Sequence, residues 1–192
     1  SKADILVENF KPGTLEKWGF GWKDINKKYP KLIYASASGF GQTGPLKELP
    51  AYDMVVQGMG GLMSVTGQPN SEPTRVGTSI GDITAGLFTA IGINAALYDR
   101  QKTGKGMFID VSMLDCQIAI LENAIARYLS KNEIPKPMGS RHPSIAPFEA
   151  FKTKDNYIII AAGNDKLFEK LCNLLQIPEV SKDPKFSDNS SR

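Results

Sequence analysis

Hydrophobic and polar positions over the first forty residues follow the order strand, helix, helix, strand. The short apolar runs at residues 4–7 and 31–38 predict buried strands. Between them, residues 14–18 and 22–29 mix apolar and charged positions as short helices do, and each is followed by a glycine or a proline. Strands that alternate with helices are typical of an α/β fold with a parallel sheet. We therefore expect the chain to open in such a sheet.

The stretch at residues 83–97 holds no charged residue and is rich in Ala, Leu, Ile and Phe. A helix that is apolar on all sides is a buried helix. The stretch is shorter than the about twenty residues that cross a bilayer, and it contains Thr84, Thr89 and Asn94. We therefore expect the buried central helix of a soluble core, stopped at Gly104.

The rest of the pattern divides the chain into two parts. Prolines and a glycine within residues 130–143 mark a linker. We expect part of a large domain over residues 1–129 and part of a small α+β domain over residues 144–192. The further elements expected are a glycine-interrupted helix at 52–65, a strand at 106–112, an amphipathic helix at 113–129, strands at 148–152 and 156–162, and a helix at 166–175.

Composition excludes several classes of protein. The 192 residues are 41% hydrophobic and 22% charged, as in globular proteins. Basic residues are scattered and the net charge is +3, so we expect no nucleic-acid partner. Cys116 and Cys172 form no metal or redox motif, so we expect no metal site and two reduced core thiols.

Targeting signals are not recognised in the sequence. Without a signal peptide, transmembrane segment or lipidation motif, we expect a cytoplasmic protein, or a mitochondrial one in a eukaryote, with no membrane partner. The sequence opens without Met directly on a strand pattern and stops in polar residues. We expect it to be a piece of a longer protein.

Candidate chemistry begins at Asp82, which follows Gly81 and precedes the uncharged stretch. Asp is a favoured N-cap residue, worth about 1 kcal/mol, and this role alone would explain it. A helix N-terminus would also keep a poorly solvated carboxylate ionised, and an ionised carboxylate can act as a nucleophile. The two interpretations are compatible, and the neighbouring residues do not decide between them.

Residues 39–44 match the pattern Gly-x-Gly-x-x-Gly directly after a predicted strand. A dinucleotide site also needs a helix that starts within the pattern and an acidic residue about twenty positions later. Here Pro45 and Pro50 follow, and Ser64 stands near the acidic position. We therefore interpret the glycines as a loop over which a substrate backbone can pass closely.

Seven stretches stand in a fixed order along the chain. They are Ala-Asp-Ile-Leu-Val-Glu-Asn-Phe-Lys-Pro-Gly (3–13), Ser-Gly-Phe-Gly-Gln-Thr-Gly-Pro (38–45), Ala-Tyr-Asp (51–53), Gly-Asp-Ile-Thr-Ala-Gly (81–86), Lys-Thr-Gly-Lys-Gly (102–106), His-Pro…Pro-Phe (142–148) and Gly-Asn-Asp (163–165). In this order the sequence resembles the class III (CaiB–BaiF type) CoA-transferase family. The resemblance implies a Rossmann-like α/β large domain, a smaller α+β domain, and a homodimer of two chains interlocked like rings.

The resemblance places Asp82 at the family's catalytic aspartate. That carboxylate attacks an acyl-CoA thioester, and the reaction passes through an acyl anhydride and an aspartyl-CoA thioester. Acyl-CoA and carboxylic acids are then the substrates, and no cofactor is bound permanently. We expect the N–H groups of Gly81 and Gly163 to hold developing oxyanions, and the turn Gly163-Asn164-Asp165 to be a mobile loop that covers Asp82.

The same resemblance assigns residues to coenzyme A and suggests the acids. The residues are Asn9, Phe10 and Lys11 in a loop, Lys17 and Trp18 on the adenine and phosphate side, and Ala51, Tyr52 and Asp53 on the pantetheine side. Some relatives carry Arg at position 17, and Lys keeps that charge but not the bidentate phosphate geometry. We expect the acids to be dicarboxylic, such as oxalate, succinate or glutarate.

Two alternatives stand beside CoA transfer. Racemases of the superfamily abstract a proton with a His–Asp pair, and that histidine aligns with Tyr52. Tyrosine, with a pKa of about 10, is a poor general base at neutral pH, and the single histidine, His142, belongs to a different motif. The sequence therefore favours CoA transfer over an acyl-CoA racemase or epimerase. The intact Gly81-Asp82 pair argues against a non-catalytic CoA-binding homologue.

Overall fold

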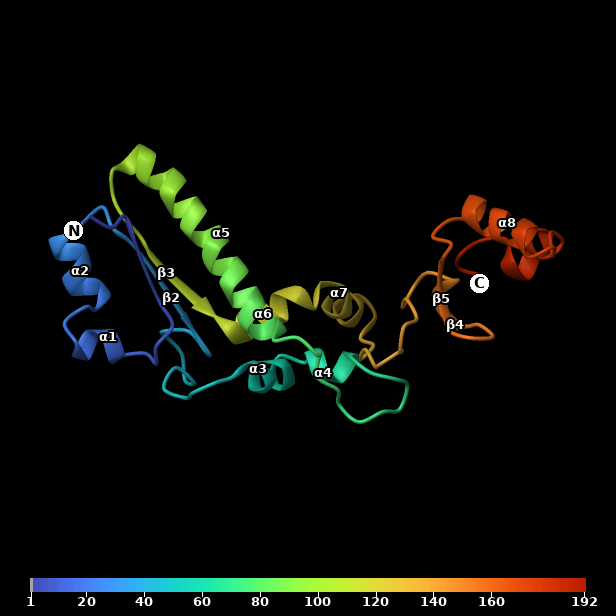
Figure 1. Ribbon diagram of the computed structural model, residues 1–192, viewed down its shortest axis with the longest axis horizontal. Helices are drawn as coiled ribbons and strands as arrows, with labels where there is room; N and C mark the ends of the chain where they lie inside the picture. The colour runs from blue at the N-terminus through green and yellow to red at the C-terminus, as the bar shows by residue number, and fades with distance from the viewer. Residues whose placement is uncertain (1) are drawn as a thin grey trace. The chain divides into compact units, whose positions relative to one another are not determined.

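The computed structural model describes residues 2–192, which fold into two compact units (Figure 1). The first unit runs to Gly67 and resumes over Glu72–Lys136, and the second comprises Gln68–Ser71 and Pro137–Arg192. Each unit has its own buried cluster of side chains.

The first unit is built on a parallel three-stranded sheet, as the sequence pattern predicts. Its strands are β1 (Ile5–Glu8), β2 (Ile33–Ser38) and β3 (Phe108–Ser112), in the order β1-β2-β3. The central strand β2 is almost entirely buried, because strands of parallel sheets are covered on both faces. The register pairs Glu8 with Ser36 and Ser36 with Asp110, so three polar residues stand in one row across the sheet.

Helices cover both faces of this sheet (Figure 1). One face carries Tyr34 and packs against α1 (Thr14–Lys17) and α2 (Trp22–Lys28), with Ile25 and Leu32 in the buried cluster. The opposite face carries Val111 and packs against the long helix α5 (Ile80–Thr103). Successive strand residues point to opposite faces, and this alternation supplies apolar contacts to both layers.

Helix α5 begins after its N-cap residue Ser79 and ends at Gly104, whose left-handed φ of 70° closes the helix as predicted. The prediction that it is buried on all sides is wrong for this chain, because the sheet and its neighbouring helices cover only one side. The buried positions are Gly81, Thr84, Ala85, Thr89 and Ala96, whereas Ile83, Leu87, Ile91 and Tyr98 are exposed. By length and composition alone, α5 is also the one helix among residues 2–192 that could cross a membrane.

Four short helices complete the first unit. They are α3 (Asp53–Met59), α4 (Leu62–Val65), α6 (Met113–Ile120) and α7 (Glu122–Lys131). The break between α3 and α4 lies at Gly60 and Gly61, as the glycine interruption predicts. The single helix predicted over residues 113–129 is wrong, because the Leu121 N–H bonds the Ile118 carbonyl in a tight turn that divides it.

The second unit pairs β4 (Phe148–Lys152) with β5 (Tyr157–Ala161) in an antiparallel hairpin, followed by α8 (Asp165–Leu174). Two 3₁₀ turns, η1 (Val180–Lys182) and η2 (Pro184–Phe186), lead to the end of the chain. The core consists of Ala162, Phe168 and Cys172, with Arg192 stacked on the Phe168 ring. Cys116 and Cys172 are free and buried, as expected.

Candidate active site

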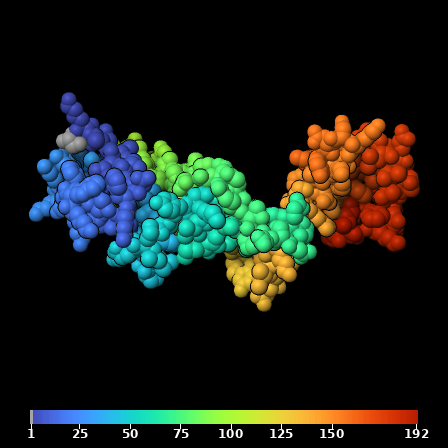
Figure 2. All heavy atoms as spheres, turned by 60° about the horizontal axis from the view of Figure 1, so that its bottom comes forward, coloured from blue at the N-terminus to red at the C-terminus, as the bar shows by residue number. Residues whose placement is uncertain are grey.

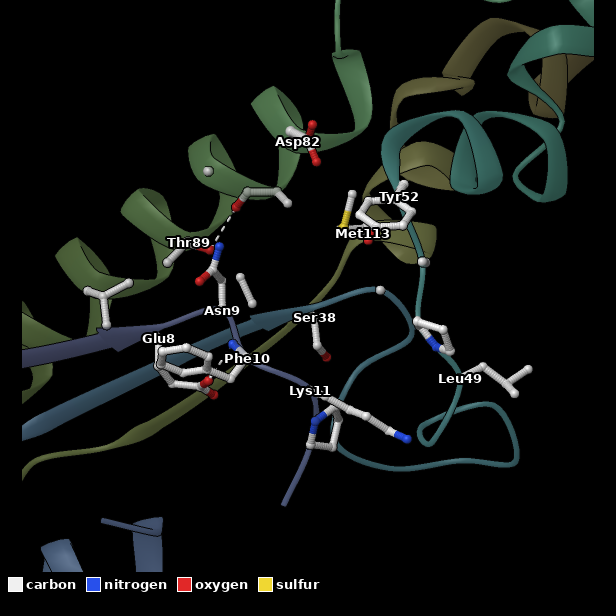
Figure 3. A pocket seen from close by; sticks show the side chains of 18 of the residues that line it. Glu8, Asn9, Phe10, Lys11, Ser38, Leu49, Tyr52, Asp82, Thr89 and Met113 are labelled. Atoms are coloured by element: carbon white, nitrogen blue, oxygen red, sulfur yellow. Dashed lines mark hydrogen bonds between the residues drawn. The ribbon is translucent and has the colours of Figure 1, made fainter. Parts of the chain in front are cut away.

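A cavity of about 830 Å³ lies at the carboxyl ends of β1 and β2 in the first unit (Figure 3). Its walls are the loop after β1, the segment that leads into α3, and one side of α5 from Asp82 onward. The first two walls lie next to each other in Figure 2, in dark blue and cyan. Ligands of open α/β sheets bind at this edge, and small-molecule sites have volumes of about 300–1,000 Å³.

Six of the residues predicted for CoA binding or catalysis line this cavity. They are Asn9, Phe10, Lys11, Ala51, Tyr52 and Asp82. They come from three segments that are far apart in the sequence, and Figure 3 shows all but Ala51 by label. Met113, the first residue of α6, also lines the cavity and was missed. Its place directly after a strand is the signal that could have found it, because strand ends meet at this edge.

Two predicted CoA contacts, Lys17 and Trp18, lie outside the cavity wall. Trp18 is exposed and meets the ring of Phe10 edge to face, with ring centroids 5.3 Å apart. Trp18 therefore supports a wall residue and extends the apolar surface beyond the cavity. Lys17 ends α1 beside it and is exposed. Whether either residue contacts coenzyme A stays a prediction.

Asp82 lies in the first turn of α5, and its exposed side chain stands on the cavity wall. The N-cap is Ser79, so the interpretation of Asp82 as the N-cap is wrong. Figure 3 shows the carboxylate directed toward the side where Tyr52 and Met113 lie. Within residues 2–192, no hydrogen bond or ion pair engages this carboxylate. It is therefore available to a bound molecule.

The surroundings of Asp82 change its acidity. Removal of water by the cavity walls raises the pKa of Asp82 above its ordinary value, and repulsion by the Asp53 carboxylate raises it further. This direction is opposite to the expected effect of the helix N-terminus. A more basic carboxylate is a stronger nucleophile once it is ionised.

Asp53 holds the start of α5 and does not line the cavity. Its buried carboxylate accepts hydrogen bonds from the Gly81 N–H at 2.7 Å and from Gln57 Nε2 at 2.8 Å, and Arg75 lies 3.9 Å away. The prediction that the Gly81 N–H holds an oxyanion needs correction, because Asp53 already occupies that donor. The spacing of Asp53 and Gln57 on one helix face is the signal that could have found this pair.

Three predicted residues, Gly163, Asn164 and Asp165, belong to the second unit. Asn164 is the N-cap of α8, and its Oδ1 accepts the Leu167 N–H at 2.9 Å. Asp165 accepts a hydrogen bond from Arg192 at 2.7 Å. The expectation that this turn covers Asp82 concerns both units and stays a prediction. Over the described part of the chain, 2–192, no group of three His, Cys, Asp or Glu side chains is placed to hold a metal ion.

Comparison with known proteins gives one consistent result. The model of "CoA-transferase family III" matches residues 1–192. The chain is 48% identical to the acetyl-CoA:oxalate CoA-transferase of Acetobacter aceti, over 100% of this chain and 49% of that protein. It is 42% identical to the succinyl-CoA:glutarate CoA-transferase of Homo sapiens, over 99% of this chain and 43% of that protein.

Solved structures agree with the curated relatives. A CAIB/BAIF family protein from Brucella suis superposes with a TM-score of 0.84 and 46% sequence identity, over 100% of this chain and 50% of that one. The chain therefore spans about half the length of the curated relatives and solved structures that it matches.

Proposed function

The chain belongs to CoA-transferase family III, and from this premise we propose that its protein transfers coenzyme A between two carboxylic acids, with Asp82 as the nucleophile. The observation that carries the proposal is the Asp82 carboxylate, which stands unengaged on the wall of a cavity of about 830 Å³. The chain spans about half the length of its relatives, so the activity proposed is that of the whole protein.

In the proposed complex, coenzyme A lies along this cavity. We assign Asn9, Phe10 and Lys11 to the nucleotide end, where the Lys11 ammonium attracts phosphate and Phe10 and Trp18 offer aromatic surface. The pantetheine arm then runs past Ala51 and Tyr52 toward Asp82. In this pose the thioester carbonyl reaches the carboxylate.

The donor acyl-CoA passes its CoA to Asp82 in two steps. Asp82 attacks the thioester carbonyl, the C–S bond breaks, and a mixed acyl anhydride and the CoA thiolate form. The thiolate then attacks the Asp82 carbonyl of the anhydride, which releases the first acid as its carboxylate and leaves an aspartyl-CoA thioester. Each attack generates an oxyanion, and we assign the Gly163 N–H to stabilise it when the turn Gly163-Asn164-Asp165 closes over Asp82.

The incoming acid reverses these two steps. Its carboxylate attacks the aspartyl thioester and expels the CoA thiolate, which attacks the acyl carbonyl of the new anhydride. The new acyl-CoA leaves and the Asp82 carboxylate is restored. No proton, oxidant or metal is consumed in the cycle. The relatives named for oxalate and for glutarate support a dicarboxylic acid as acceptor.

The proposed assembly is a homodimer. The exposed apolar residues along the outer side of α5 support it, since a large exposed apolar surface marks a contact site.

The test uses the full-length protein with succinyl-CoA as donor and oxalate or glutarate as acceptor. Hydroxylamine converts an aspartyl anhydride or thioester into a stable hydroxamate, and mass spectrometry then locates it. We expect the hydroxamate on Asp82, and Asp82→Asn should lower transfer at least about a thousandfold. Asp99→Asn is the matched control, because it makes the same change on α5 at roughly 25 Å along the helix. Transfer with an unmodified Asp82 would refute the mechanism.

A further inference from the structure

We propose that a hydrogen-bond chain from Gln42 through Ser36 to Glu8 positions the loop of residues 9–11 for coenzyme A. Gln42 and Ser36 are then positioning residues for substrate binding. This inference rests on the proposed function, since it takes the loop to be a CoA-binding one. It also gives a role to the glycine pattern at residues 39–44, which dinucleotide binding does not explain.

The loop after β2 is fastened to the sheet face opposite α5. The backbone N–H of Gln42 lies 3.0 Å from each carboxylate oxygen of Asp110 on β3. The preceding residue, Gly41, has a left-handed φ of 81°, and a Cβ there would lie 3.5 Å from both Asp110 oxygens and from Cβ of Ser112. Glycine therefore supplies the backbone conformation that lets the loop turn down onto Asp110.

The side chain of Gln42 continues the connection across the sheet. Its Nε2 donates to Ser36 Oγ at 2.7 Å, and the Ser36 hydroxyl donates to Oε1 of Glu8. Ser36 is fully buried on the central strand, and the strand register places it directly beside Glu8. Hydrogen bonds to a carboxylate are about twice as strong as neutral ones.

The last bond of the chain reaches the cavity wall. Oε2 of Glu8 accepts the backbone N–H of Phe10 at 2.9 Å. Phe10 stands between Asn9 and Lys11, and all three line the cavity. Glu8 thus fixes the backbone of this loop, and Gln42 and Ser36 fix the carboxylate of Glu8.

The chain of bonds therefore joins two walls of one site. The loop fastened by Gln42 runs on to Leu49 and Ala51, which line the same cavity as residues 9–11. A binding loop that is already ordered loses less conformational entropy when its ligand binds. Breaking the chain should weaken binding of coenzyme A while leaving the chemistry at Asp82 in place.

The experiment uses the full-length protein and three variants. Gln42→Met keeps the length of the side chain without its donor, Ser36→Ala removes the hydroxyl, and the third variant combines both. We expect KM for succinyl-CoA to rise about five- to tenfold in each, with kcat within about twofold. The KM of the double variant should not exceed the higher KM of the two single variants, because both changes break the same chain of hydrogen bonds. Thr43→Ala, an exposed neighbour in the same loop, is the control.

Hydrogen exchange gives a second readout that does not depend on turnover. Peptides that contain residues 9–12 should exchange faster in Gln42→Met and Ser36→Ala than in the wild type or in Thr43→Ala. Unchanged KM and unchanged exchange in Gln42→Met would overturn the inference, and so would a fall in kcat at constant KM. If the wild type transfers no CoA, the proposed function fails, and the exchange data still decide whether this chain orders the loop. If Ser36→Ala does not fold, Gln42→Met decides alone.

Discussion

Replacing Gly81 with alanine tests how closely α5 must approach α3 for Asp82 to be placed. A Cβ at Gly81 would lie 2.7 Å from Cγ2 of Val56 and 3.0 Å from Oδ1 of Asp53. Val56 and Asp53 are both buried on α3, so they have little room to move away. The two helices must separate, and Asp82, the next residue, moves with its helix.

Opposing contributions determine how much Gly81→Ala changes the free energy of unfolding. Alanine favours a helix over glycine by about 1 kcal/mol. Overpacking a buried contact costs about 1–3 kcal/mol, and weakening the hydrogen bond from the Gly81 N–H to the Asp53 carboxylate adds up to about 1.5–3 kcal/mol. The free energy of unfolding should therefore fall, by up to about 5 kcal/mol when both costs reach their upper ends. A misplacement of about 1 Å at a reacting group can reduce kcat about a hundredfold.

The assay compares two alanine variants of α5 in the full-length protein. A Cβ at Gly86 would meet no atom within 4 Å beyond its chain neighbours and the nearby backbone of its own helix, so Gly86→Ala should gain about 1 kcal/mol and raise Tm. Gly81→Ala should lower Tm, and its kcat should fall about tenfold to a hundredfold. Gly86 lines the cavity, so it serves as the control for stability alone. A rise in Tm for both variants would refute the close approach at Gly81.

Two further predictions concern titrating groups. The charge of Asp53 raises the pKa of Asp82, so Asp53→Asn should lower that pKa. The acid limb of the kcat/KM profile should then move to lower pH. An acid limb that stays in place would show that Asp53 does not act through its charge. Burial, then Glu8 and Glu16, raise the pKa of Tyr34 from 10.0 to about 12. The stability that its neutral phenol contributes is fully present below pH 10 and is lost as pH rises toward about 12. Urea unfolding between pH 10 and about 12 should show that Tyr34→Phe loses less stability than the wild type as pH rises. Tyr98→Phe, which changes an exposed tyrosine, should lose as much stability as the wild type.

Local sequence patterns predicted most elements of the fold, because each depends on residues close together in the chain. The three strands of the sheet and the end of α5 at Gly104 are such cases. The break at Leu121 was missed, since it is one short turn without a glycine or a proline. The burial of α5 was overestimated, because burial depends on how much of a helix its neighbours cover, and composition does not report that.

In the candidate site, too, some features could be predicted from the sequence and others could not. Motif resemblance singled out Asp82 and the loop of residues 9–11, and six of the predicted residues line one cavity. The bond between Asp53 and Gly81 joins positions 28 residues apart, and the bond between Ser36 and Glu8 joins positions equally distant. Such pairs arise from strand register and helix packing, which a single sequence does not specify.

The carboxylates around the cavity differ in what their oxygens already bind, and this difference separates structural from chemical roles. Both oxygens of Asp53 accept hydrogen bonds, and so do both oxygens of Glu8. A carboxylate in that state would have to break these hydrogen bonds before it could attack a thioester, which costs about 1–3 kcal/mol for each buried partner left unpaired. Asp82 has no such partner within residues 2–192, and its pKa is raised. Among these three carboxylates, Asp82 is therefore the one that can attack a thioester without dismantling the walls of the site.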